Sequence, residues 1–110
     1  MIGCVVAENP HGLLGSVVIS KQGRDRGKPG VIFGWIEGDF ALVADGRLRT
    51  ISKPKKKNMK HLYFTGYRLG ELSRRLLTGG QVTDGMISEG LSAFGEWAKG
   101  RTAVWQKAMS

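Results

Sequence analysis

Short apolar runs, separated by glycine and charged residues, follow one another through the first half of the chain. Positions 17–21 are dense in β-branched residues, and apolar runs return at 31–36 and 40–44. Such side chains pack well on a pleated surface and lose rotamer freedom in a helix. The pattern therefore predicts a β-meander whose longest connection, residues 22–30, is an exposed, glycine-rich cationic loop.

Residues 47–51 alternate charged and apolar positions, which is the period of a strand. Arg47 and Arg49 are then expected together on one face, and Leu48 with Thr50 on the other. An Asp-Gly pair just before this run favours a tight hairpin. We therefore predict a short fourth strand from which two arginines project together.

Five lysines fall within the eight positions from Lys53 to Lys60. Their mutual repulsion, together with Pro54, predicts an extended surface segment and disfavours both a helix and a central strand. Strand character returns at residues 61–65. Five short strands joined by closely spaced turns predict a mainly β fold, a small SH3-like barrel, because closing the sheet removes its exposed edges.

The periodicity becomes helical near residue 69. Leucines at helical spacing up to Leu77, followed by Gly79 and Gly80, predict a short helix. Thr83 or Asp84 is a suitable N-cap for a second helix, whose apolar stripe consists of Ile87, Leu91, Phe94, Trp97 and Ala98. We expect the two helices to form a hairpin folded against the barrel.

These patterns divide the chain into four parts. They are an N-terminal strand or extension (1–13), the barrel (14–66), a helical hairpin packed on or appended to the barrel (67–100), and a tail (101–110).

The charge of the chain is strongly positive and unevenly spread. Seventeen Lys and Arg outweigh nine Asp and Glu, which gives a net charge of +8, and residues 1–61 carry +6 of it. A concentrated positive field indicates a polyanionic partner for the β-rich part. The alternative is a solvated cationic surface that only maintains solubility.

The low cysteine content is typical of a protein from a reducing compartment. Cys4 is the one cysteine of the sequence, so an intramolecular disulfide and a thiolate metal cluster are both excluded. The sequence shows no signal peptide and no apolar stretch long enough for a membrane span. We expect a cytoplasmic protein that does not bind membranes.

Four motifs follow one another in the β-rich part, and together they resemble a known family. They are Gly15-x-Val17-Val18, Gly23-Arg24-Asp25-x-Gly27, Asp45-Gly46-x-x-Arg49 and Lys53-Pro54-Lys55-Lys56-Lys57-Asn58-x-Lys60-His61-Leu62. This set resembles a bacterial KOW-domain RNA-binding protein, which is similar to the KOW-containing ribosomal large-subunit proteins of archaea and eukaryotes. The resemblance covers a little under half of the chain. It implies an SH3-like barrel fold and, as partner, RNA in the form of ribosomal RNA or ribosomes.

The candidate RNA-binding residues are the cations of the first long loop, of the predicted fourth strand and of the lysine run, with the histidine that follows the run. They are Arg24, Arg26, Lys28, Arg47, Arg49, Lys53, Lys55, Lys56, Lys57, Lys60 and His61. Loops at one end of a small barrel converge, so we expect these blocks to form one surface. Arginine offers a bidentate fork to phosphate, whereas lysine offers a point charge. For His61, contact with a phosphate or base edge and a packing role both stay open.

Three further loop residues are expected to shape the backbone. Gly23 and Gly27 serve turn geometry or a close approach of the backbone to phosphate, and Asp25 braces the loop by hydrogen bonding. Among the aromatic residues, Phe33, Trp35 and Phe40 are expected in the core. Tyr63 and Tyr67 are better placed for stacking on bases, although a core position is favoured for them as well.

Catalytic motifs are missing from the predicted elements. They carry no carboxylate pair, no histidine spacing typical of a metal site and no nucleophile beside a base. We therefore expect no enzyme activity and no cofactor, and a non-catalytic RNA-binding protein is the leading hypothesis. The alternative is a protein-interaction adaptor that binds a protein partner through the barrel and the amphipathic C-terminal tail, with Trp97 and Trp105 as its anchors.

Overall fold

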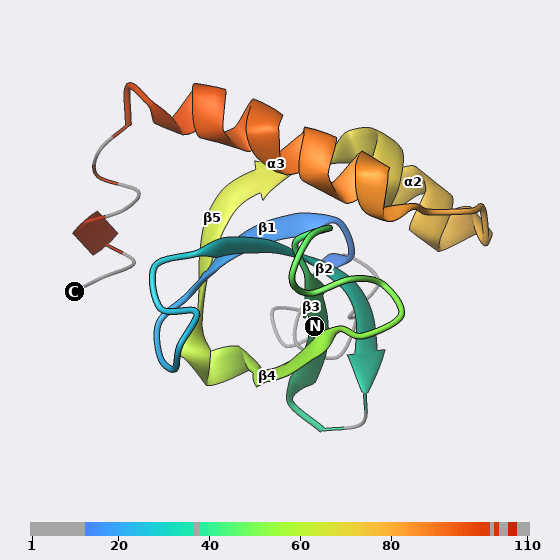
Figure 1. The fold of residues 1–110 in the computed structure, drawn as a ribbon, viewed down its shortest axis with the longest axis horizontal. Helices are drawn as coiled ribbons and strands as arrows, with labels where there is room; N and C mark the ends of the chain where they lie inside the picture. The colour runs from blue at the N-terminus through green and yellow to red at the C-terminus, as the bar shows by residue number, and fades with distance from the viewer. Residues whose placement is uncertain (1–12, 37, 102, 104–105, 108–110) are drawn as a thin grey trace, which may run out of the picture.

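Five short segments of the chain pair into one antiparallel sheet in the order β4-β3-β2-β1-β5. The computed structural model describes residues 13–36, 38–101, 103 and 106–107. Its strands are β1 (Ser16–Ser20), β2 (Pro29–Ile36), β3 (Phe40–Ala44), β4 (Lys55–Asn58) and β5 (Leu62–Arg68). The sheet curls strongly, and both helices lie on its convex side (Figure 1). Four strands therefore follow one another as a meander, and the fifth returns to the far side of β1.

Strand β1 is buried on both faces. Its side chains alternate, so Val17 and Ile19 contribute to one cluster of buried residues and Val18 to the other, and all three are at most 1% exposed. The helix-side core joins Val17, Ile19, Val31 and Ala44 to Leu69, Leu72, Ile87, Phe94 and Ala98. The concave-side core consists of Val18, Ile32, Ala41, Val43 and Leu62, with Leu14, Trp35 and Phe64 packed against it. A strand enclosed in this way needs apolar residues at consecutive positions, which explains the β-branched run.

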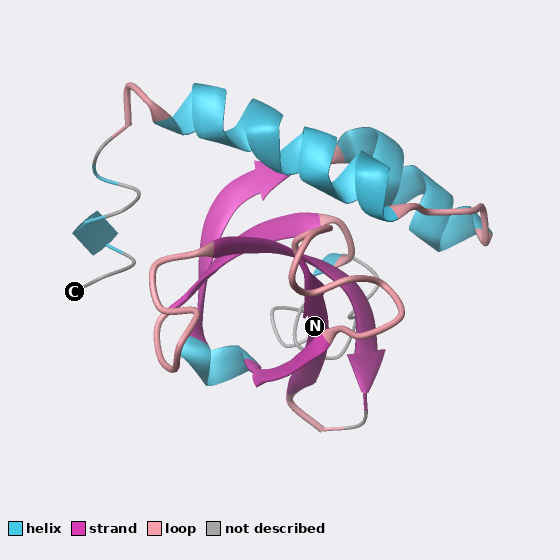
Figure 2. Ribbon diagram, viewed as in Figure 1, coloured by secondary structure: helices cyan, strands magenta, loops and turns pink. Residues whose placement is uncertain are grey.

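Two helices supply one wall of the helix-side core, as predicted. Helix α2 (Gly70–Thr78) ends at Gly79, which takes a left-handed conformation with φ of 79°. Helix α3 (Asp84–Ala98) begins after Thr83, whose hydroxyl accepts a hydrogen bond from the Met86 amide at 3.2 Å. The helices and the loops that join the elements are distinguished by colour in Figure 2. Because their apolar residues share one core with β1, the helices are part of the same folded unit as the sheet.

The predicted strand at residues 47–51 is wrong, because this segment is a turn. The Asp45 carboxylate accepts hydrogen bonds from the amides of Arg47 (2.8 Å) and Arg49 (2.9 Å), which closes the chain on itself. The Ile51 amide then donates to Asp84 Oδ1 at the start of α3, at 2.8 Å. Side chains that hydrogen-bond to nearby amides compete with strand pairing in this way. Residues 45–51 therefore dock on α3 and do not form a hairpin with β3.

The lysine run supplies the fourth strand. Residues 55–58 pair with β3, with Lys55 opposite Val43 and Lys57 opposite Ala41. β4 ends the sheet on this side, so the prediction that the run is extended and not a central strand agrees with the structure. The prediction of a surface segment fails for Lys57, which is buried. A single 3₁₀ turn, η2 (Met59–His61), joins β4 to β5.

Two predicted segments lie largely outside the described residues. The N-terminal strand or extension falls on 1–13, of which the structure describes residue 13 alone, and Cys4 lies in the remainder. The tail beyond residue 101 is described at 103 and 106–107, so Trp105 is outside as well. Within the described ranges, no helix has both the length and the apolar character that a membrane span requires.

Replacing Gly46 by alanine tests the docking of the turn on α3. Gly46 has φ of +82°, and a Cβ there would lie 2.5 Å from the Asp84 carbonyl oxygen and 3.0 Å from the Ser88 nitrogen. Gly38 is a matched control, because it has φ of +77° and no atom within 4 Å of such a Cβ. In urea unfolding we expect Gly38→Ala to cost about 1–2 kcal/mol from backbone strain alone. Gly46→Ala should cost about 1–3 kcal/mol more. Equal losses for the two variants would show that the turn does not pack on α3.

Candidate nucleic-acid interface

The loop between β1 and β2 is a closed hairpin loop. The Gly27 amide donates to the Ser20 carbonyl at 2.8 Å, and the Lys28 amide donates to the Asp25 carbonyl at 2.8 Å. Gly23 and Gly27 have φ of +86° and +85°, a conformation that other residues rarely adopt. Turn geometry, one of the two predicted roles, therefore requires both glycines. The loop carries its cations on a defined backbone.

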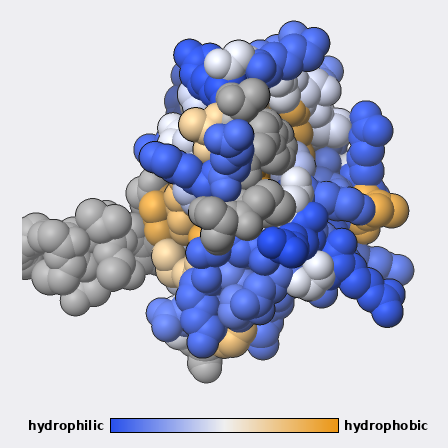
Figure 3. Space-filling view, turned by 90° about the vertical axis from the view of Figure 1, so that its left-hand side faces the viewer, coloured by the Kyte–Doolittle hydropathy of each residue, from blue (hydrophilic) through white to orange (hydrophobic). Residues whose placement is uncertain are grey.

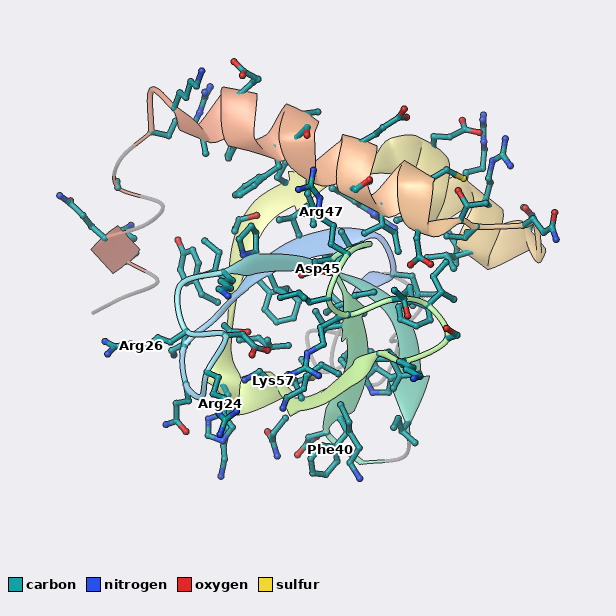
Figure 4. The ribbon with its side chains drawn as sticks, viewed as in Figure 1. Arg24, Arg26, Phe40, Asp45, Arg47 and Lys57 are labelled. Carbon is teal, nitrogen blue, oxygen red and sulfur yellow. The ribbon has the colours of Figure 1, made fainter. Side chains whose placement is uncertain are left out.

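The buried Lys57 of β4 hydrogen-bonds to the backbone of this loop. Its ammonium group donates to the Gln22 carbonyl oxygen at 2.8 Å, and the residue is 8% exposed. Figure 4 shows the side chain pointing from β4 into the curl of the sheet, toward the loop. Lys57 shares this face of β4 with Lys55, since side chains alternate along a strand. The Lys57 side chain thus points into the protein. We therefore assign it to positioning the loop and not to the cationic surface.

The turn after β3 brings a second set of cations to the same place. Besides its carboxylate bonds, Asp45 donates its amide to the Arg49 carbonyl at 2.8 Å, so the turn is closed at both ends. Arg49 lies 3.9 Å from Asp25 of the first loop, measured between Nη2 and Oδ1. Asp25 was predicted to brace its own loop by hydrogen bonding, whereas the contact found for its carboxylate is this ion pair between two segments. Exposed pairs of this kind contribute little to stability, about 0–1 kcal/mol.

Cations from three separate segments surround one pocket of about 370 Å³. We call it the basic pocket and define it by its four cations, Arg24, Lys28, Arg49 and Lys55. Two carboxylates, Asp25 and Asp45, also line it, and its apolar wall contains Pro29, Gly30, Val43, Ala44 and Leu48. Within the described part of the chain, the only ion pair among its four cations is that of Arg49. Three blocks of cations were expected to converge, and these four side chains do so, although the block with Arg49 is a turn and not the expected strand.

A second, shallower pocket extends this surface toward α3. It shares Lys28, Pro29 and Asp45 with the basic pocket and adds Arg47, together with Ser88, Leu91 and Ser92 of α3. In Figure 4, Arg47 lies on the side of the sheet that faces α3, whereas Arg26 points outward from the first loop. Arg47 therefore continues the surface around the basic pocket, and Arg26 extends it outward.

The remaining candidates surround the basic pocket less closely. Lys56 lies on the other face of β4, with its ammonium 4.7 Å from the centre of the Phe40 ring. Lys53 and Lys60 are exposed, and His61 is half-buried, with its carbonyl accepting a hydrogen bond from the Lys21 amide at 2.8 Å. None of these four lines the basic pocket. The view in Figure 3, turned toward the side that carries the first loop, shows hydrophilic residues over most of its surface.

Three residues near this surface escaped the sequence prediction. Lys21 is exposed at the start of the first loop, but as a predicted strand residue it was not counted among the cations. Leu48 was expected on one face of a strand, yet it is 77% exposed at the edge of the basic pocket. Gly30 has an ordinary φ, and it is required because a Cβ would lie 2.5 Å from Val43 Cγ1. No local pattern distinguishes such a packing glycine from a turn glycine.

The aromatic side chains occupy mainly core positions. Phe33 packs against the helix-side core, as do Tyr63 and Tyr67, the two tyrosines that were the better stacking candidates. Tyr67 also contacts Trp97, with ring centres 5.0 Å apart. Phe40 belongs to neither core cluster and pairs with Lys56 instead. Base stacking at this interface would therefore depend on side chains other than the two tyrosines.

Both arginines of α2 pair with one carboxylate, whereas Arg49 alone among the four cations of the basic pocket has an ion pair within the described residues. Glu71 accepts hydrogen bonds from Arg75, at 2.9 Å, and from Arg74. The hydrogen bond from Arg75, and next to it the charge of Arg74, lower the pKa of Glu71. The helix surface is thus partly neutralised. Charge should therefore be less neutralised at the basic pocket, where Arg24, Lys28 and Lys55 have no ion pair within the described part of the chain.

Neither metal chemistry nor family membership adds to this description. In the ranges that the structure covers, no three His, Cys, Asp or Glu side chains are grouped so as to hold a metal ion. Comparison of the chain with models of protein families and with curated proteins finds no match. The interface is therefore argued from its geometry.

Replacing Lys57 by methionine tests its role in positioning the loop. The variant keeps the length of the side chain but loses the hydrogen bond to Gln22. We expect amide hydrogen exchange at Arg26, Gly27 and Lys28 to accelerate about tenfold, the equivalent of about 1.4 kcal/mol of local opening. Lys56→Met is the matched control, since it removes the same charge from the neighbouring, exposed position. Unchanged exchange in Lys57→Met, or equal acceleration in both variants, would contradict the positioning role.

Proposed function

We propose that this protein is a non-catalytic RNA-binding module that acts on ribosomal RNA or ribosomes. The observation that carries the proposal is the convergence of Arg24, Lys28, Arg49 and Lys55 on one pocket. These residues come from three separate segments: the loop after β1, the turn after β3 and the start of β4. A net charge of +8 attracts any polyanion at long range. The four convergent cations provide a defined site at which the polyanion can bind.

Binding would proceed through the phosphate backbone. Each phosphate that a lysine or arginine neutralises releases condensed counterions, and this release supplies most of the non-specific affinity. Arginines at the pocket offer bidentate forks to phosphate, and the lysines offer point charges. Structured RNA displays its backbone and minor groove more readily than its base edges, so shape would supply most of the selectivity.

The proposal includes an SH3-like barrel fold of the KOW type. Supporting it are the strong curl of the five-stranded sheet and the order in which β5 returns to β1. The motifs Gly23-Arg24-Asp25-x-Gly27 and Asp45-Gly46-x-x-Arg49, which carry the resemblance to KOW proteins, lie in the two segments that meet at Arg49 and Asp25. The resemblance is also the reason to name ribosomal RNA among polyanions.

The adaptor alternative loses part of its support. Trp97 was one of its two anchors, yet its ring packs 5.8 Å from Phe94 and 5.0 Å from Tyr67. Arg101 lies over the same ring, with its guanidinium carbon 4.4 Å from the ring centre. A side chain engaged in this way offers little free surface to a protein partner. We therefore favour RNA over a protein as the main partner.

Neutralising the pocket tests the proposal against general electrostatic attraction. The test variant is Arg24→Gln, Lys28→Gln and Lys55→Gln, and the control is Arg74→Gln, Lys99→Gln and Arg101→Gln. Both lose three positive charges, but the control residues are exposed on or beside the helices and do not line the basic pocket. Binding to purified ribosomal RNA is measured over a series of salt concentrations.

We expect the pocket variant to reduce the slope of log K against log salt by about 2 to 3, since three phosphate contacts are lost. The control should reduce the slope by less than about 1, because these charges attract RNA only at a distance. Equal changes in the two variants would contradict a defined interface. A wild-type protein that fails to bind ribosomal RNA at low salt would overturn the proposed function itself.

A further inference from the structure

The basic pocket combines an apolar wall with charged surroundings. Gly30 contributes no side chain, and a Cβ there would lie 2.5 Å from Val43 Cγ1, so any larger residue would displace Val43 or occupy the space. Pro29 and Ala44 complete an uncharged wall. Gly30 thus lets Val43 pack closely in this wall, and the concave site has a volume of about 370 Å³, within the size range of small-ligand pockets.

Leu48 holds an apolar side chain in water at the edge of this pocket. It is 77% exposed, the larger of the two exposed fractions found for big apolar residues in the described ranges. Its backbone is fixed, because Asp45 accepts hydrogen bonds from both of its neighbours, Arg47 and Arg49. Single exposed leucines are common on protein surfaces. Here, however, the position beside an apolar wall and four cations makes Leu48 a preformed contact for a flat apolar group.

The two carboxylates of the pocket determine which part of a nucleotide enters. Asp25 and Asp45 line the wall, so a phosphate inside the pocket would face negative charge as well as positive. A nucleobase is uncharged, and adenine, cytosine and guanine carry amino groups that can donate hydrogen bonds to a carboxylate. The favourable arrangement therefore places the base inside and the phosphates outside, on the cations.

We propose that the basic pocket takes one unpaired nucleotide of an RNA strand. The base lies between Leu48 and the apolar wall, and its flanking phosphates contact Arg24, Lys28, Arg49 and Lys55. In a continuous helix each base face is covered by its neighbours, whereas a bulged or looped-out base exposes its face. This inference rests on the proposed function, and it specifies that the RNA partner presents an unpaired base at the site.

The test compares two labelled RNA duplexes that differ by one nucleotide. One duplex is fully paired, and the other carries a single unpaired adenosine. Fluorescence anisotropy at fixed salt should show that the wild-type protein binds the bulged duplex about tenfold more tightly, as expected when one base buries its face against apolar side chains. The protein variant Leu48→Ser should lose this preference while its affinity for the paired duplex changes less than about twofold.

Two further variants separate the contact from effects on folding. Leu77→Ser removes the other exposed leucine, which lies on α2 and does not line the basic pocket, and it should leave both affinities unchanged. Leu48→Phe restores a flat apolar surface and should retain the preference. If the wild-type protein binds both duplexes equally, or if Leu77→Ser acts like Leu48→Ser, the nucleotide site is wrong while the proposed function stands.

The remaining outcomes distinguish other occupants of the pocket. If adenosine monophosphate alone binds as tightly as the bulged duplex, the pocket serves a free nucleotide, and the inference of a site for an RNA strand fails. If neither duplex binds at low salt and ribosomal RNA does not bind either, the proposed function fails and the inference fails with it.

Discussion

The double burial of strand β1 is the constraint on which the rest of the structure depends. Val17 and Ile19 pack under the helices, while Val18 packs in the concave-side core. Each of these side chains contributes roughly 1.5–3 kcal/mol by leaving water, so neither face can be left uncovered. The helices cover one face, and the curl of the sheet covers the other. That curl brings the loop after β1, the turn after β3 and the start of β4 together around one pocket.

Some charged residues at the interface fix the backbone, and others present their charge to solvent. Lys57 is turned inward and holds the first loop through Gln22, while Asp45 closes the turn that carries Arg47 and Arg49. These fixed backbones present the cations in one arrangement before any ligand arrives. Preorganised charges of this kind bind with less loss of conformational freedom. Lys57 and Asp45 therefore position the backbone of the interface, and the cations on that backbone are available to bind a ligand.

Local patterns were enough to predict most elements of the fold. β-Branched runs identified β1, β2 and β3, and leucine spacing with a terminal glycine identified α2. The error at residues 47–51 has a local and a distant cause. The Asp45 carboxylate accepts hydrogen bonds from the nearby amides of Arg47 and Arg49, and the Ile51 amide donates to Asp84, which lies 33 positions away. An Asp-Gly pair predicts a hairpin equally well whether or not the residues after it hydrogen-bond to a distant helix.

The same limit applies to the candidate site. Composition and charge predicted which residues are cationic, and the segments that carry them do meet at Arg24, Lys28, Arg49 and Lys55. Sequence alone could not separate Lys57 from its neighbours, because burial depends on the register of β4 against β3. Nor could it identify Leu48 as exposed, since the alternation of a strand does not hold in a turn. Tertiary packing determines that Lys57 is buried and that Leu48 is exposed.

We expect RNA to bind where the first loop, the turn after β3 and the start of β4 meet. NMR chemical-shift mapping with a short ribosomal RNA hairpin would locate the contact residue by residue. Binding at this place should give saturable shifts of the amides in residues 21–30, 45–49 and 53–56, with little change in α2 and in the second half of α3. Shifts centred on the helices, or none that saturate at low salt, would rule out this interface.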